Sequence, residues 1–145
     1  MKKTLPYLAI PLIVGGVIAL ALLTNTRKAY VNLYDVQLKR QKIPCLSLSV
    51  YPPNPSIENA LKNAYVFQAN CPWKLAIKTK ENIHCNSNQN SDKKALTAFP
   101  NSFLRMEIRK GFSLKYSYYV DLTKAADPDD ALEGFDRIIS DLKIK

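Results

Sequence analysis

His84 and Cys85 are the residues of this sequence whose types could carry out nucleophilic chemistry. A cysteine–histidine hydrolase needs its thiol and imidazole to face each other in space. Adjacent residues of an extended chain point in opposite directions, so this pair does not form that arrangement by itself. His84 is the only histidine in the chain, and no nearby Ser or Cys is arranged as a nucleophile beyond its neighbour Cys85. We therefore expect no catalytic residues and no enzymatic activity.

Metal and cofactor sites are not expected either. The His84-Cys85 pair lacks two further ligands at the spacing of a zinc site. Asp127, Asp129 and Asp130 lack the glycine and the terminal glutamate of a calcium loop, and they flank a proline that is typical of a helix start. Glycine is too scarce for a phosphate-binding loop. The sequence thus indicates no metal and no cofactor.

The three cysteines allow two interpretations. In an oxidising compartment they would give one disulfide and one free thiol, and in a reducing one they would give three thiols. For an exported chain we expect the disulfide to join Cys71 and Cys85, because these residues bracket a predicted strand and a polar loop. Closing so short a loop stabilises a fold by about 3 kcal/mol. A thiol-redox role for Cys45 or Cys85 is the least supported functional alternative.

A membrane anchor is predicted near the amino terminus. From Leu5 to Leu23 the sequence carries no charge, and a helix of these nineteen residues spans roughly 28 Å. The alternative is a cleaved signal peptide, since two lysines precede the run. The anchor is favoured because the run exceeds a usual signal core and its small-x-small motif, Ala19 to Ala21, lies inside it. Pro11, Gly15 and Ala19 fall four apart, which predicts a smooth stripe for packing against another membrane helix.

The orientation of the anchor follows from two opposing arguments. More positive charges follow the apolar run than precede it, which favours a cytoplasmic domain. A very short basic amino tail is typical of exported signal-anchors, and long domains translocate largely regardless of charge. We expect a single-pass protein of the bacterial inner membrane with a periplasmic domain. The predicted organisation is a cytoplasmic tail (1–4), an anchor (5–23), a membrane-proximal helix or linker (24–42) and a soluble α+β domain (43–145).

Hydrophobic periodicity predicts the elements of the soluble domain. The anchor continues as an amphipathic helix to about Gln41, with a strand over 30–38 as the alternative. Strands follow at 45–51 and 73–78, and a hairpin at 104–122 turns at Lys110-Gly111. Helices are expected over 56–68, capped by Ser56, and from Pro128 to about Leu142. The helix from Pro128 is expected to bury Leu132, Phe135, Ile138, Ile139 and Leu142. The sequence therefore predicts an antiparallel sheet covered by helices on one face.

The other face of this sheet is expected to be basic. The formal net charge is +9, and positive side chains alternate with apolar ones along the central strands. The candidate partner-binding residues on this face are Lys74, Lys78, Arg105, Arg109 and Tyr119. A basic surface suits acidic proteins, anionic lipids or nucleic acid. Nucleic-acid binding is not expected, because no run of Lys and Arg exceeds two residues.

These observations predict a protein that works through its surfaces. We expect a non-catalytic interaction or scaffold subunit of a bacterial cell-envelope complex of the secretion, pilus, motor or transport type. Its partners would be the membrane and other envelope proteins, which contact the membrane span and the exposed sheet face. The alternative is a membrane-tethered periplasmic domain that binds an anionic ligand of the envelope.

Overall fold

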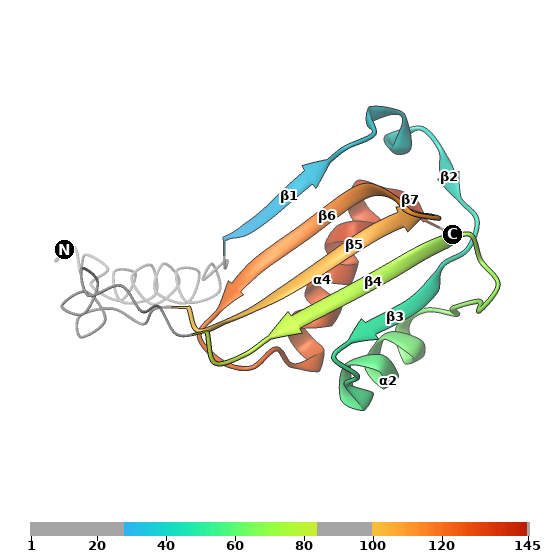
Figure 1. Ribbon diagram of the computed structural model, residues 1–145. Helices are drawn as coiled ribbons and strands as arrows, with labels where there is room; N and C mark the ends of the chain where they lie inside the picture. Colours follow the sequence, from blue (N-terminus) through green and yellow to red (C-terminus); the bar gives the residue numbers. More distant parts are fainter. Residues whose placement is uncertain (1–27, 84–99, 145) are drawn as a thin grey trace, which may run out of the picture.

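Alternating apolar and polar residues form the three central strands of the fold. A computed structural model describes residues 28–83 and 100–144 (Figure 1). Strand β4 (Trp73–Lys80) is followed by the hairpin of β5 (Ser102–Lys110) and β6 (Ser113–Leu122). Gly111 turns this hairpin with φ of +57°, a conformation that glycine adopts without steric cost. The predicted strand at 73–78 and the predicted hairpin are confirmed.

The five strands of the sheet are ordered β1-β6-β5-β4-β3. β1 (Ala29–Leu33) pairs antiparallel with β6, whereas β3 (Ser47–Tyr51) pairs parallel with β4. The prediction of a wholly antiparallel sheet is therefore wrong at its last pair. Helix α2 (Pro55–Ala64) connects β3 to β4. A helical crossover of this kind allows the second strand to run parallel to the first.

Both α-helices of the described residues begin at a polar cap. α2 is capped by Asn54, whose side chain accepts hydrogen bonds from Ser56 N and Ile57 N, so the expected cap at Ser56 lies two residues late. α4 (Pro128–Asp141) is capped by Asp127, and Asp130 returns a hydrogen bond to the backbone N–H of Asp127. The helix predicted from Pro128 is confirmed.

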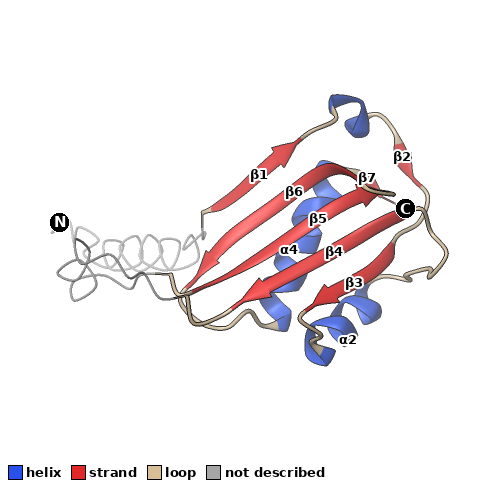
Figure 2. Cartoon of the chain, in the orientation of Figure 1, coloured by secondary structure: helices blue, strands red, loops and turns tan. Residues whose placement is uncertain are grey.

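The helices cover one face of the sheet, and the core lies between the two layers (Figure 2). α4 approaches the sheet closely at Gly134, where an added Cβ would lie 2.6 Å from Met106 Sδ and 2.9 Å from Tyr118 Cε1. Phe135 and Ile138 are fully buried beside it. Ile139 is 37% exposed, so its predicted burial is wrong: the helix turns this side chain away from the sheet.

The segment before β3 is not the predicted amphipathic helix. It consists of β1, a 3-10 turn η1 (Val36–Lys39) and a short strand β2 (Lys42–Ile43) that pairs parallel with β7 (Lys143–Ile144). The alternative interpretation as a strand is correct for Ala29–Leu33. Val31 and Leu33 of β1 pack against the core, while Tyr30 and Asn32 between them are exposed, which is the period of a strand.

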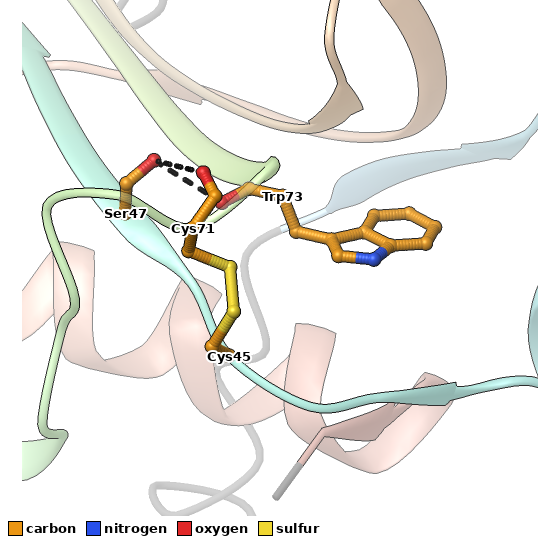
Figure 3. The surroundings of a disulfide bond; sticks show 4 residues. All are labelled: Cys45, Ser47, Cys71 and Trp73. Carbon is orange, nitrogen blue, oxygen red and sulfur yellow. Dashed lines mark hydrogen bonds between the residues drawn. A yellow bond between two sulfur atoms is a disulfide. The ribbon is translucent and has the colours of Figure 1, made fainter.

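The disulfide joins Cys45 to Cys71, with a Cα–Cα distance of 5.9 Å (Figure 3). Each cysteine lies two residues before its strand, and parallel pairing of β3 with β4 brings the two strand starts together. Ser47 Oγ donates a hydrogen bond to the Trp73 carbonyl at 3.1 Å in the same place. The predicted bond between Cys71 and Cys85 is wrong, because Cys71 is already paired, and Cys85 lies outside the described residues.

The predicted membrane anchor lies outside the described residues, as do Pro11, Gly15 and Ala19 of its packing stripe and the pair His84-Cys85. Within residues 28–83 and 100–144, neither α2 nor α4 has the length and apolar character of a membrane-crossing helix.

Candidate partner-binding face of the sheet

The side of the sheet that faces away from α2 and α4 is called the open face. Alternation along the strands decides which residues it carries, since partners in register point to the same side. Its central residues come from the three longest strands. They are Lys74, Ala76, Lys78 and Lys80 of β4, Phe103, Arg105, Glu107 and Arg109 of β5, and Ser117, Tyr119 and Asp121 of β6.

The structure brings all five predicted partner-binding residues together on the open face. Lys74 lies opposite Arg109, and Lys78 lies opposite Arg105 in the β4–β5 register. Arg105 in turn lies opposite Tyr119 in the β5–β6 register. Like charges directly across an antiparallel pair disfavour the sheet. Glu107 lies between the two basic pairs in the register, opposite Ala76, and offsets part of this repulsion.

Glu107 holds the two arginines of the open face. Its Oε1 lies 2.6 Å from Arg105 Nη2, and its Oε2 lies 2.7 Å from Arg109 Nε. Glu107 as a residue is 9% exposed, whereas the arginine side chains remain 42% and 36% exposed. Charge-assisted bonds of this length restrict the guanidinium groups, which keep further donors for an external acceptor. Glu107 is a residue of the site that sequence reasoning misses, although the Arg-x-Glu-x-Arg spacing places all three residues on one face.

Lys74 and Lys78 add positive charge that no carboxylate of the described part of the chain pairs. Both side chains are exposed, and within residues 28–83 and 100–144 no ion pair involves either one. Lys80 lies two residues beyond Lys78 on the same face of β4 and is exposed as well. The β4–β5 part of the open face thus carries five basic side chains and the single carboxylate of Glu107.

Tyr119 is half-buried and belongs to an aromatic row beside the basic residues. Its ring centroid lies 5.4 Å from that of Phe103 and 6.4 Å from that of Tyr30. Its hydroxyl donates a hydrogen bond to Asp121 Oδ1 at 2.8 Å. Burial, and then the bond to Asp121, raise the pKa of Tyr119 to about 12, so the hydroxyl stays protonated at neutral pH. The Tyr119 ring thus contacts two other aromatic rings beside the basic residues of β5.

The carboxylate of Asp127 is engaged by two neighbouring groups. Asp127 accepts from the backbone N–H of Asp130 and pairs with Lys124, and these contacts lower the pKa of Asp127 to about 2, the lysine being the larger cause. Across the two described ranges, no cluster of His, Cys, Asp and Glu has the geometry to hold a metal ion. The basic residues gathered on the open face are suited to binding anions.

Comparison with solved structures finds a distant likeness to a known protein. No family model and no curated protein matches the sequence. Two solved structures of the PelC dodecamer from Paraburkholderia phytofirmans, one of them a point variant, align with 83% of this chain and 99% of theirs. Their sequence identities to this chain are 10% and 11%, with TM-scores of 0.39 and 0.40 for the variant and the other form. A likeness this distant carries no inference about the function or assembly of this chain.

Proposed function

We propose that this protein is a non-catalytic interaction subunit of a bacterial cell-envelope complex, and that its open face binds an acidic partner protein. The observation that carries the proposal is the presence of two basic rows, each running across β4 and β5. One row is Lys74 with Arg109, and the other is Lys78 with Arg105. Glu107 fixes the arginines of both rows in place. Fixed, partly desolvated charges bind an opposite surface with a smaller loss of side-chain entropy than free ones do.

The layout of these charges suits a protein surface better than a small ligand. Lys74 and Lys78 are four residues apart on β4, which corresponds to about 13 Å along the strand. The paired arginines on β5 lie one strand away, at about 4.8 Å. The positive charge is therefore spread over a flat area and does not converge on one point. Tyr119 and Phe103 border it, and protein interfaces are enriched in arginine and in aromatic residues.

The compartment in this proposal is the periplasm. The Cys45–Cys71 disulfide supports it, because such bonds persist in exported proteins and are rare in the bacterial cytoplasm. We propose the predicted single-pass anchor with its packing stripe as the second contact with the same complex. A domain held near the membrane would then present the open face to an acidic neighbour.

Charge reversal of the two unpaired lysines tests this proposal. Full-length tagged protein carrying Lys74→Glu with Lys78→Glu is extracted in mild detergent, and co-purifying proteins are quantified against the unmodified chain. Lys39→Glu with Lys143→Glu is the matched control, since both lysines are exposed, lie off the open face and change the net charge equally. We expect the open-face variant to lose its acidic partner by about tenfold or more, equivalent to about 1.4 kcal/mol. Equal recovery with both variants contradicts the proposal.

A linear anionic ligand of the envelope is the second candidate. The repeat of basic pairs along β4 and β5 favours it, since regularly spaced charges can follow a polymer of regularly spaced anions. This candidate would come first if the purified chain bound a polyanion, if only the open-face variant bound it more weakly, and if no protein co-purified from any extract.

A further inference from the structure

β3 is an edge strand, and the chain beside it leaves most of its outer side free. The segment after α2 passes outside the start of β3 (Figure 1), where Gln68 N donates to the Leu46 carbonyl at 2.8 Å. Backbone groups of alternate residues in a strand point to the same side. Leu48 and Val50 therefore direct their N–H and C=O groups to this outer edge. In the described ranges, no backbone hydrogen bond from outside the sheet reaches either residue.

A hollow of about 460 Å³ lies along this edge. Leu48 and Phe67 supply apolar surface to it, and Lys62 and Lys74 supply positive charge. Leu48 and Val50 are half-buried on the helix-covered side of β3, whereas Ser49 and Tyr51 are exposed on the side of the open face. The two sides of the edge thus differ: one offers apolar contact and the other leads to the lysines of β4.

We infer that the outer edge of β3 binds an extended segment of another protein by strand addition, and that this segment alternates apolar and acidic residues. Strand addition takes its affinity from main-chain hydrogen bonds and its specificity from alternate side chains. One set of side chains would pack against Leu48 and Phe67 of the hollow and against Val50 further along β3. The other set would lie over Ser49 on the open face, about 10 Å from the β4 backbone, within reach of Lys74 and Lys78.

This inference goes beyond the proposed function, because it concerns the edge of the sheet and needs neither arginine of the open face. The inference also specifies the order of apolar and acidic residues in the bound segment, in addition to its negative charge. An acidic segment with the same composition in another order would place carboxylates against the apolar side chains of Leu48, Val50 and Phe67, where removing them from water without hydrogen-bond partners is unfavourable.

The test is the binding of short peptides to the full-length chain in mild detergent, measured by fluorescence anisotropy. One short peptide alternates Asp and Val, and its control has the same residues with all Asp before all Val. We expect the alternating peptide to bind at least about tenfold more tightly. N-methylation of every second residue should abolish binding for one of the two alternate sets and leave the other set nearly unchanged, because only one set directs its N–H groups at β3.

Protein variants complete the test. Lys74→Glu should weaken the alternating peptide about fivefold, and the off-face control Lys143→Glu should not. Equal affinities for the two peptide orders, equal effects of the two N-methylation patterns, or no binding at about millimolar peptide would each overturn the inference. The co-purification experiment on the open face stands apart from these outcomes, because it measures a partner and not a peptide at the edge.

Discussion

The two faces of the sheet are made by the same strands and have opposite properties. Tyr118 and Tyr119 are neighbours on β6, yet Tyr118 is 3% exposed against Gly134 of α4, while Tyr119 borders the basic rows of the open face. Leu75 is fully buried between the exposed Lys74 and the half-buried Ala76. A strand thus separates core from surface residue by residue, because its side chains alternate. The covered face therefore holds the buried core, and the open face carries the charged side chains that we propose for partner contact.

The open face has one exception to this division. Glu107 points to the open side and is still buried, because Arg105 and Arg109 enclose its carboxylate. A carboxylate enclosed in this way is stable only with its partners. Variants of the arginines therefore change folding as well as binding, which is why the lysines are the better probes of docking.

The largest contrast is expected from phenylalanine truncation on each face. Phe135→Ala empties a fully buried site that also contacts Tyr65 and Phe67, and it should reduce the free energy of unfolding by about 3–5 kcal/mol. Phe103→Ala on the open face loses little more than its contact with Tyr119 and should cost about 1 kcal/mol. Urea denaturation of both variants measures the contrast. Equal losses would mean that the open face is part of the core.

The second prediction concerns the enclosed carboxylate. Arg105→Glu with Arg109→Glu surrounds Glu107 with like charges, and the free energy of unfolding should fall by about 3 kcal/mol. Glu107→Gln keeps the shape and leaves two arginines that water can reach, so it should cost only about 1 kcal/mol. Denaturation at low and high salt measures both effects, and the loss in the double variant should shrink with salt. A double variant as stable as the unmodified chain would contradict the enclosure.

The third prediction tests how closely α4 packs on the covered face. Alanine favours a helix over glycine by up to about 1 kcal/mol, but a Cβ at position 134 would press on Met106 and the rigid ring of Tyr118. We expect Gly134→Ala to lower the free energy of unfolding by about 1–2 kcal/mol. Ser140→Ala, on the exposed side of the same helix, should change it by less than about 0.5 kcal/mol. A stabilised Gly134→Ala would show that the helix can move outward at little cost.

The smallest effect is expected at the cap of α4. Asp127→Ala removes the side chain that accepts from Asp130 N and should cost about 1 kcal/mol at neutral pH. The folded pKa of Asp127 is lowered to about 2 from an ordinary value of 3.8. The stabilisation is therefore present above pH 3.8 and is lost as the pH falls towards 2. Thermal melts of both proteins at several pH values should converge in that window, and a constant difference down to pH 2 would contradict the assignment.

Much of the fold follows from the sequence because local patterns agree with the final packing. The hairpin of β5 and β6, strand β4 and helix α4 each carry an unbroken period and a turn or cap residue. Residues 29–33 form a strand where the favoured prediction is a helix, because their apolar spacing fits both. Pairing with β6 decides between them, and that contact is distant in sequence.

The disulfide and the site illustrate the same limit. Cys45 and Cys71 meet because β3 and β4 run parallel, which the strand–helix–strand order indicates but the cysteine spacing alone does not. The five candidate residues of the open face were placed by alternation within each strand. Their alignment into two basic rows and the burial of Glu107 depend on the register between strands, which no single-strand pattern specifies.

Photo-crosslinking in intact membranes tests docking on the open face most directly. A photoreactive residue replaces Ala76, which lies between Lys74 and Lys78 on the open face, and a control replaces the exposed Asn59 of α2. We expect a crosslink from position 76 to an acidic envelope protein, lost with Lys74→Glu and Lys78→Glu, and no such crosslink from position 59. The same adducts from both positions, or none from position 76, would contradict docking on the open face.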